Sequence, residues 1–325
     1  MVCPSCGDDA NPPGARFCEN CGASLDPAAL GLPKGRGCRC PEPDFDADGF
    51  CRNCGMKAPK AIPAVETEQV IDAALALASD RGRRHATNQD FGVVARRADG
   101  VALIVVADGV SASDNPEAAS RAAAKAAERA FLKADAGEGP LSAEAQALAR
   151  EAAEALLAIP IAERRHDGPA STIVIALARE NATSGVVDVG LAWVGDSRAY
   201  FVAANVPETL LTRDDSWPVE QVESGRMTRE EAMRSPNAHA ISQWLGMPIA
   251  EMVVHAKDVV LTHGASLLLC SDGLWNYADE PSALARAFTD AAKDAPDAAT
   301  ICRALVGFAN AAGGADNITV GLLRV

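Results

Sequence analysis

The run Val101-Ala-Leu-Ile-Val-Val-Ala-Asp108-Gly109 is the most informative segment of this 325-residue chain. Its apolar, β-branched part predicts a buried strand, and the acid and glycine that follow mark the end of that strand. A second segment, Ser266-Leu-Leu-Leu-Cys-Ser-Asp272-Gly273, repeats the arrangement. Each predicted strand therefore places one carboxylate at its end, next to a glycine that frees the backbone.

Further apolar runs on either side of these segments predict the rest of the fold. Strands are expected over residues 171–178, 186–194, 199–203 and 318–323, each bounded by Gly, Asp or Asn. Alanine-rich stretches near residues 116–132, 142–157, 283–291 and 298–312 have helical patterning. Because the strands come in groups instead of alternating strictly with helices, we expect an α+β fold with antiparallel sheets.

Two more acids, Asp196 and Asp316, lie beside predicted strands, and a fifth acid, Asp90, lies in Asn88-Gln-Asp90. Together with Asp108 and Asp272 they would repel one another unless a cation neutralised them. Oxygen ligands without His favour Mg²⁺ or Mn²⁺ over zinc, and two such ions can promote attack of hydroxide on a phosphorus atom. A single Asp-Gly pair is most often a turn, but five acids at strand ends indicate a metal centre.

Six segments, in this order, resemble the metal-dependent Ser/Thr protein phosphatases (the PPM or type 2C family) over residues 70–325. They are Asp80-Arg-Gly82 leading into Asn88-Gln-Asp90, Val106-Ala-Asp108-Gly109, Ala170-Ser-Thr172, Val194-Gly-Asp196-Ser-Arg198-Ala-Tyr200, Leu268-Leu-Cys-Ser-Asp272-Gly-Leu-Trp275 and Asp316-Asn-Ile-Thr-Val320. One such segment is weak evidence, whereas six in family order are specific. The resemblance implies a four-layer α-β-β-α sandwich of two antiparallel sheets flanked by helices.

The resemblance also implies two Mn²⁺ or Mg²⁺ ions and a third, weaker one. The implied ligands are Asp108, the Gly109 carbonyl, Asp272, Asp316 and, for the third ion, Asp196. Asp108 would bridge the two main ions, and Asp90 would hydrogen-bond a metal-bound water. The implied reaction is hydrolysis of phosphoserine or phosphothreonine on proteins by a metal-bound hydroxide, which opposes Ser/Thr kinases in signalling.

Three positions depart from the family pattern. His85 stands where the family has an Arg that binds the substrate phosphate, and Arg83 and Arg84 precede it. Gln89 replaces a Glu, and Val110 replaces the His that animal members carry. We assign His85 to the catalytic site with Asp108 and Asp90, with a turn or surface role as the alternative. The departures also leave open a catalytically weak scaffold that docks partners through its N-terminal region.

The polar stretch 212–240 is named the flap segment here. It contains Thr228-Arg-Glu-Glu231, a capping box that predicts a helix start. By resemblance this segment lies beside the active site and shapes substrate choice. An ordinary surface helical hairpin is the alternative.

Eight of the ten cysteines lie in the first 54 residues and indicate a separate small domain. They form two sets, Cys3, Cys6, Cys18 and Cys21, then Cys38, Cys40, Cys51 and Cys54. The paired spacing of the first set predicts a four-thiolate zinc site, and the second set differs in opening with Cys-x-Cys. No export signal is visible, which favours zinc over disulfides. We predict a double zinc ribbon with two structural Zn²⁺ over residues 1–57, a linker over 58–69 and the phosphatase domain over 70–325.

The charge limits the classes of partner. A net charge of -14 argues against nucleic acid and anionic membranes. The first 60 residues carry seven Lys/Arg against eight Asp/Glu, which is not the electrostatic footprint of a DNA-binding ribbon. The longest apolar run, residues 101–107, is far shorter than the roughly 18 residues of a membrane span. We expect a cytoplasmic protein whose partners are phosphorylated proteins and a Ser/Thr kinase or its targets.

Overall fold

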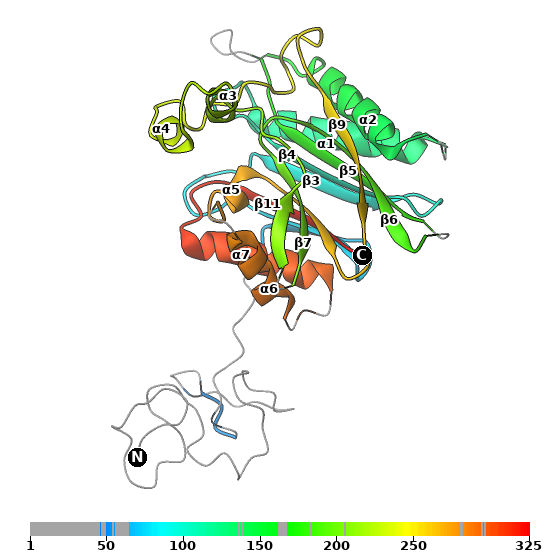
Figure 1. The fold of residues 1–325 in the computed structure, drawn as a ribbon, viewed down its shortest axis with the longest axis vertical. Coiled ribbons are helices and arrows are strands. Elements are labelled where there is room, and N and C mark those ends of the chain that lie inside the picture. The colour runs from blue at the N-terminus through cyan, green and yellow to red at the C-terminus, as the bar shows by residue number, and fades with distance from the viewer. Residues whose placement is uncertain are drawn as a thin grey trace. The chain divides into compact units, whose positions relative to one another are not determined.

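The computed structural model describes residues 46, 50–53, 55 and 65–325, except 136, 138, 162–167, 182–183, 205, 280–281, 294 and 296. The chain divides into two units, Met1–Ile62 and Pro63–Val325, and every helix and strand given below belongs to the second (Figure 1). The predicted double zinc ribbon falls almost wholly outside the described residues. Of its eight cysteines only Cys51 is described, and its side chain is buried.

Two antiparallel sheets form the centre of the second unit. The first has the strand order β1-β2-β11-β10-β7-β8, formed by Thr67–Val70, Leu75–Asp80, Ile318–Arg324, Ser266–Cys270, Arg198–Ala203 and Val206–Leu210. The second has the order β3-β4-β5-β6-β9, formed by Asp90–Arg96, Ala102–Asp108, Ile173–Asn181, Val186–Val194 and His255–Leu261. The expectation of antiparallel sheets is confirmed.

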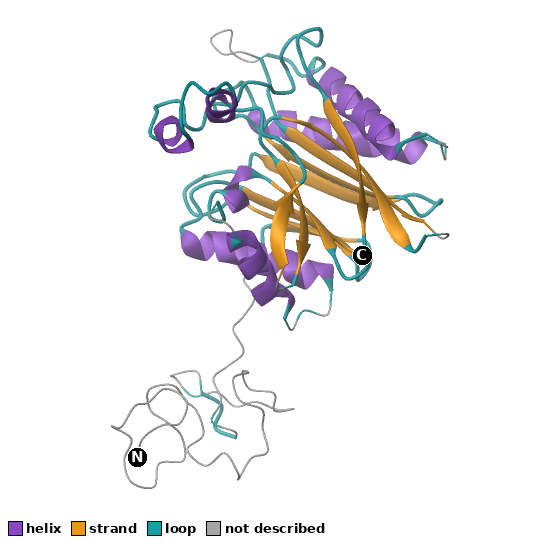
Figure 2. Ribbon diagram, viewed as in Figure 1, coloured by secondary structure: helices purple, strands orange, loops and turns teal. Residues whose placement is uncertain are grey.

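Helices cover the outer face of each sheet (Figures 1 and 2). The helices α1 (Pro116–Lys133) and α2 (Leu141–Leu156) pack on the second sheet, whereas α6 (Ala283–Ala292) and α7 (Ala298–Ala312) pack on the first. The predicted α-β-β-α sandwich is therefore confirmed. Within the part of the chain that the structure describes, none of the helices combines the length and apolar character that a membrane crossing requires.

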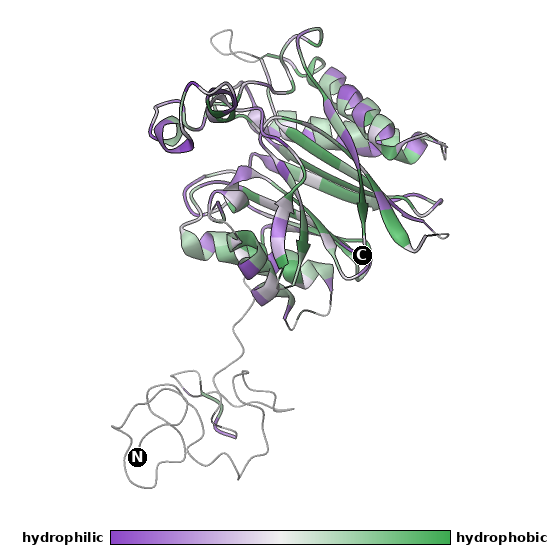
Figure 3. Ribbon diagram, viewed as in Figure 1, coloured by the Kyte–Doolittle hydropathy of each residue, from purple (hydrophilic) through white to green (hydrophobic). Residues whose placement is uncertain are grey.

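The strand β4 shows why the sequence produces this layering. Leu103 and Val105 lie in the core beneath α1 and α2, whereas Ile104 and Val106 lie in the core between the two sheets. Successive side chains of a strand point to opposite faces, so a strand that is covered on both faces must be apolar throughout. Figure 3 shows the hydrophobic residues concentrated in the strands and on the sheet-facing sides of the helices.

Three short helices lie near the ends of the strands. The flap segment contains α3 (Trp217–Glu223) and α4 (Arg229–Met233), and α5 (Asp272–Trp275) follows β10 directly. The predicted capping box is confirmed at α4: the Thr228 hydroxyl accepts from the Glu231 amide at 3.2 Å, and the Glu231 carboxylate accepts from the Thr228 amide at 2.8 Å.

Candidate active site

Two neighbouring strands place Asp90 and Asp108 opposite each other. Asp90 begins β3, Asp108 ends β4, and the two are direct partners in the antiparallel register. The Ser271 hydroxyl donates to Asp90 Oδ2 at 2.6 Å and so ties Asp90 to the end of β10 in the other sheet. Burial raises the pKa of Asp90 to about 6, against the hydrogen bond from Ser271, which lowers it.

The backbone at Asp108 and Gly109 is held from both sides. The Thr172 amide donates to the Asp108 carbonyl at 2.8 Å, and the Gly109 amide donates to the Gln89 carbonyl at 3.1 Å. A Cβ on Gly109 would lie 2.4 Å from the Pro116 carbonyl oxygen, closer than real Cβ contacts. The end of β4 therefore cannot shift freely, which fixes the Asp108 carboxylate beside Asp90.

The first sheet supplies Asp272 and Asp316. Asp272 follows β10 and Asp316 precedes β11, and these two strands are neighbours. The segments touch closely, since a Cβ on Gly273 would lie 1.9 Å from the Asn317 carbonyl oxygen. Asp272 Oδ2 accepts a hydrogen bond from Asn276 Nδ2 at 3.2 Å within the same turn. Only a glycine at position 273 lets the two acid-bearing segments approach this far.

Asn317 fixes the loop between β2 and β3. Its Oδ1 accepts from the Gln89 amide at 2.7 Å, and its Nδ2 donates to the carbonyls of Arg81 and Thr87 at 2.8 and 3.1 Å. The loop that precedes Asp90 is thus attached to the residue that follows Asp316. This contact links the first and the last of the six resembling segments.

The departures from the family pattern also lie around this loop. His85 Nε2 is 3.3 Å from Asp316 Oδ1, and the His85 side chain is 30% exposed, so the imidazole lies at the rim of the acids. Arg83 and Arg84 are exposed. Gln89 Oε1 accepts from the Ser111 hydroxyl at 2.7 Å and therefore connects the loop to the turn after β4.

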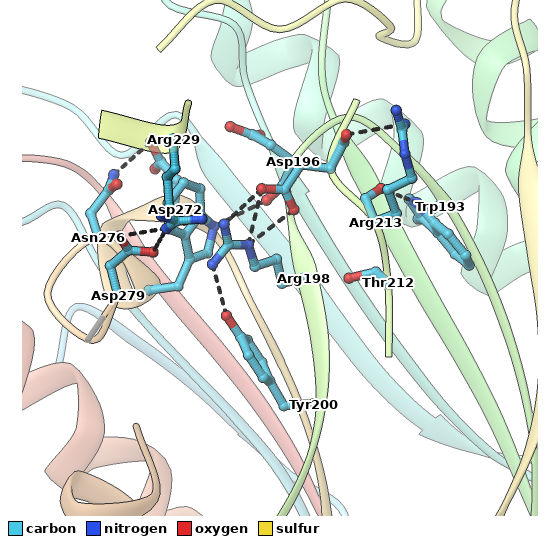
Figure 4. Close-up of polar contacts among 12 residues, drawn as sticks. Trp193, Asp196, Arg198, Tyr200, Thr212, Arg213, Arg229, Asp272, Asn276 and Asp279 are labelled. Atoms are coloured by element: carbon cyan, nitrogen blue, oxygen red, sulfur yellow. Dashed lines mark hydrogen bonds and ion pairs between the residues drawn. The ribbon is translucent and has the colours of Figure 1, made fainter. Parts of the chain in front are cut away.

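Asp196 lies in the turn between β6 and β7 (Figure 4). Its carbonyl oxygen accepts from Trp275 Nε1 at 3.0 Å. Arg198 lies over the Trp275 ring, 3.6 Å from its centroid, and forms hydrogen bonds of 2.7–3.1 Å with Asp214. Burial raises the pKa of Asp196 to about 7, and the nearby Asp214 charge adds to this. Trp275 therefore positions the Asp196 turn.

Sequence reasoning missed Asp215 and His255. Asp215 Oδ2 accepts from the Gly195 amide at 3.0 Å, and His255 Nε2 lies 2.8 Å from Asp215 Oδ1. The Trp193 ring stacks on the imidazole, with centroids 5.2 Å apart. Burial raises the pKa of Asp215, against the hydrogen bonds from Gly195 and His255. These contacts anchor the base of the flap segment to the Asp196 turn and to β9, across separations of 20 and 40 residues that no local pattern reveals.

The five predicted acids form one electrostatic group. Burial raises the pKa values of Asp108 and Asp272 well above the ordinary value, and the neighbouring acids raise them further. The acids acting on Asp108 are Asp90, Asp272, Asp196 and Asp316. Among the described residues, no three or more His, Cys, Asp or Glu side chains are gathered closely enough to hold an ion as they stand. The acids are therefore close enough to repel one another but do not form a tight cage.

Two buried carboxylate oxygens in this group indicate that a cation fits the site. Asp90 Oδ1 and Asp272 Oδ1 are buried without a hydrogen-bond partner in the described part of the chain. Burying such oxygens unpaired is costly, and a cation compensates for that cost. Because the five side chains offer only carboxylate oxygens, they suit Mg²⁺ or Mn²⁺. The residues therefore fit the divalent ions that the sequence predicts.

Residues 80–306, more than half of the chain, match the family model of protein phosphatase 2C. The chain belongs to the protein phosphatase 2C family. Among its relatives in that family, a serine/threonine phosphatase of Listeria welshimeri is 31% identical over 252 residues, which cover 76% of this chain and 93% of the relative. The serine/threonine protein phosphatase PstP of Mycobacterium tuberculosis is 31% identical over 242 residues, 74% of this chain and 43% of that protein.

Solved structures of protein phosphatase 2C members have the same fold. The catalytic domain of PstP in complex with two manganese ions is 28% identical, with a TM-score of 0.60, and the match covers 77% of this chain and 96% of that one. The phosphatase Stp1 of Staphylococcus aureus is 22% identical with a TM-score of 0.65, covering 81% of this chain and 99% of that one. The second likeness concerns the fold alone.

Proposed function

We propose that this member of the protein phosphatase 2C family hydrolyses phosphoserine and phosphothreonine on proteins in a reaction that depends on Mn²⁺ or Mg²⁺. The observation that carries the proposal is the convergence of five acids from both sheets, with buried oxygens of Asp90 and Asp272 left unpaired. The phosphatase names of the relatives and the two manganese ions bound to PstP support it. Physiological substrates would then be the targets of a Ser/Thr kinase.

The acids of the two sheets would divide the ions between them. We assign Asp108 to a bridging position, the Gly109 carbonyl to one ion, and Asp272 with Asp316 to the other. Asp196, in the turn between β6 and β7, would take a third, weaker ion. When bound, the ions would neutralise the phosphate charge and supply an activated water as nucleophile.

Two further side chains would act on the substrate and the attacking water. Ser271 fixes Asp90 Oδ2 at 2.6 Å, which leaves Oδ1 to accept a hydrogen bond from the water and orient it. His85, at the rim beside Asp316, would donate a hydrogen bond to a phosphate oxygen. The exposed guanidinium groups of Arg83 and Arg84 would attract the phosphorylated segment electrostatically.

The decisive experiment is hydrolysis of a phosphothreonine peptide by the full-length protein with Mn²⁺, with EDTA, and with Asp272→Asn. We expect turnover that requires Mn²⁺ and a loss of more than about 100-fold in kcat/KM in the variant, since even outer residues of a metal site cost about 10–100-fold. Asp290→Asn on the exposed side of α6 is the matched control for the charge change and should keep full activity. Absence of turnover with Mn²⁺ shown to be bound would instead favour the catalytically weak scaffold.

The cysteine-rich head is a separate part of the proposal. We propose that residues 1–57 bind two structural Zn²⁺ through the two cysteine sets, which requires reduced thiols and therefore favours a cytoplasmic location. Metal analysis of the purified full-length chain should find two zinc ions per molecule. A value near one would restrict the proposal to the first set, and a value near zero would overturn it.

A further inference from the structure

A pocket of about 230 Å³ opens directly beside the proposed metal site. Its inner wall includes Asp196, Asp272 and the Trp275 ring, so it is continuous with the acids. Its outer wall comes from the flap segment. The flap side chains that make this wall apolar are Pro218, Val219, Val222, Ala232, Met233 and Ala238. Val222 and Met233 are 39% and 42% exposed, unusual for large apolar side chains that only fill a core.

Apart from the acids of the proposed metal site, three pairs of opposite charges among the described residues lie around the pocket. Arg198 Nη2 donates to Asp214 Oδ2 at 2.7 Å in the pocket wall. Arg229 of α4 donates to both carboxylate oxygens of Asp279, at 2.6 and 2.7 Å (Figure 4). Arg213 binds the Glu223 carboxylate at 2.9 Å. The pocket therefore offers an apolar surface and no unpaired charge from these groups, which favours an uncharged occupant.

The size of the pocket favours one side chain over a small-molecule ligand. Binding pockets for such ligands occupy about 300–1,000 Å³, more than the 230 Å³ found here. A volume of this size is about 8 Å across, which two or three residues of extended chain span at about 3.3 Å each. A substrate whose phosphoresidue lies at the acids would place a nearby side chain in the pocket.

We propose that this pocket is a specificity subsite that binds an uncharged aliphatic side chain within three residues of the phosphoserine or phosphothreonine. The inference rests on the proposed function, because the occupant belongs to the phosphoprotein substrate. Lysine and arginine are disfavoured since the divalent ions held by Asp196 and Asp272 would repel them. Glutamate and aspartate are disfavoured because the apolar wall would desolvate their carboxylates without pairing them.

The test uses the full-length protein with Mn²⁺ and a set of phosphothreonine peptides. The parent peptide has alanine at all positions except the phosphothreonine. Each further peptide carries Leu, Lys or Glu at one of the three positions before or after the phosphothreonine. We expect Leu at one position to raise kcat/KM about tenfold over Ala, the size of effect that apolar pockets produce. In Val222→Asp and Met233→Ser that ratio should fall to about twofold or less. Met227→Ser, on the same segment but outside the pocket, is the matched control and should keep both the rate and the ratio.

The ratio between two peptides is the measured quantity, so a general loss of activity in a variant does not imitate the result. Turnover of all peptides without a Leu preference, a preference for Lys or Glu, or a Leu ratio that survives both pocket variants would overturn the subsite and leave the phosphatase assignment intact. Failure of the wild-type protein to hydrolyse any phosphothreonine peptide with Mn²⁺ would overturn the proposed function and the subsite with it.

Discussion

Replacing Asp196 by Asn should stabilise the metal-free protein while weakening its metal-dependent function. The pKa of Asp196 in the fold is about 7, against an ordinary value of 3.8, because the carboxyl is buried beside Asp214. The folded state therefore holds this proton more tightly than the unfolded state. The resulting stabilisation is complete below pH about 4 and is lost as the pH rises to about 7.

The magnitude follows from the same two values. Each factor of ten in proton affinity corresponds to about 1.4 kcal/mol, so the full loss between pH 4 and pH 8 is at most about 4 kcal/mol. Since the side chain is partly exposed, solvent screening reduces this, and we expect about 2 kcal/mol. In a domain of this size that difference corresponds to about 5 °C in Tm. Asp196→Asn should therefore melt about 5 °C above the wild type in EDTA at pH 8, and the gap should close towards pH 4.

Added Mn²⁺ should make the wild type melt at a higher temperature than Asp196→Asn. Ligand binding stabilises the folded state in proportion to the logarithm of metal concentration over Kd, and the variant gains less because it has lost a proposed ligand. Thermal melts of both proteins at pH 4, 6 and 8, with EDTA and with a saturating excess of Mn²⁺, give the full comparison. Asp290→Asn controls for the change in net charge. A variant that is less stable than the wild type in EDTA at pH 8 would refute the electrostatic reasoning.

Two further substitutions test the close approach at Gly273 and the proposed role of His85. Gly273→Ala would place a Cβ 1.9 Å from the Asn317 carbonyl oxygen, so we expect a loss of about 1–3 kcal/mol in unfolding free energy by urea titration. Gly139→Ala, with open space around its Cβ, is the control, and equal stability of both variants would contradict the close approach. His85→Ala should lower kcat/KM for a phosphothreonine peptide about tenfold through a higher KM, as expected for the loss of a hydrogen bond to a charged group. His85→Arg should retain activity, and an unaffected Ala variant would remove His85 from the phosphate site.

The sequence predicts the parts of this fold whose side chains face a core on both sides. The six apolar strands and four alanine-rich helices all appear within a few residues of their expected ends. The missed strands include β1, β8 and β9, which lie at sheet edges with several exposed residues and so lack a sustained apolar run. The missed β2 is buried throughout, but its short Leu-Ala-Leu-Ala-Ser-Asp run is poor in β-branched residues.

The candidate site also has one part that the sequence predicts and another that it does not. Four of the five acids are predictable because each sits beside a strand that the sequence marks with its own apolar run. Asp90 begins β3, which is not among the predicted strands, and is assigned through the family resemblance. The residues that hold the five acids in place are not predictable, because their roles arise from contacts between distant segments. Ser271 and Asp90 are 181 residues apart, and Asn317 and Gln89 are 228 apart. Only the sandwich of the two sheets brings these pairs together.

The residues that hold the acids in place also help to decide between an enzyme and an inactive scaffold. Burial raises the pKa values of Asp108 and Asp272, and at neutral pH their charges oppose folding. A protein that only docked partners would become more stable if amides or apolar residues replaced these acids. Instead, Ser271 fixes Asp90, and glycine at position 273 lets the Asp272 segment contact Asn317. The departures at His85 and Gln89 lie in the loop before β3 and replace none of the five acids. The arrangement is therefore better explained by an active metal centre with altered residues around it than by a site that has lost its activity.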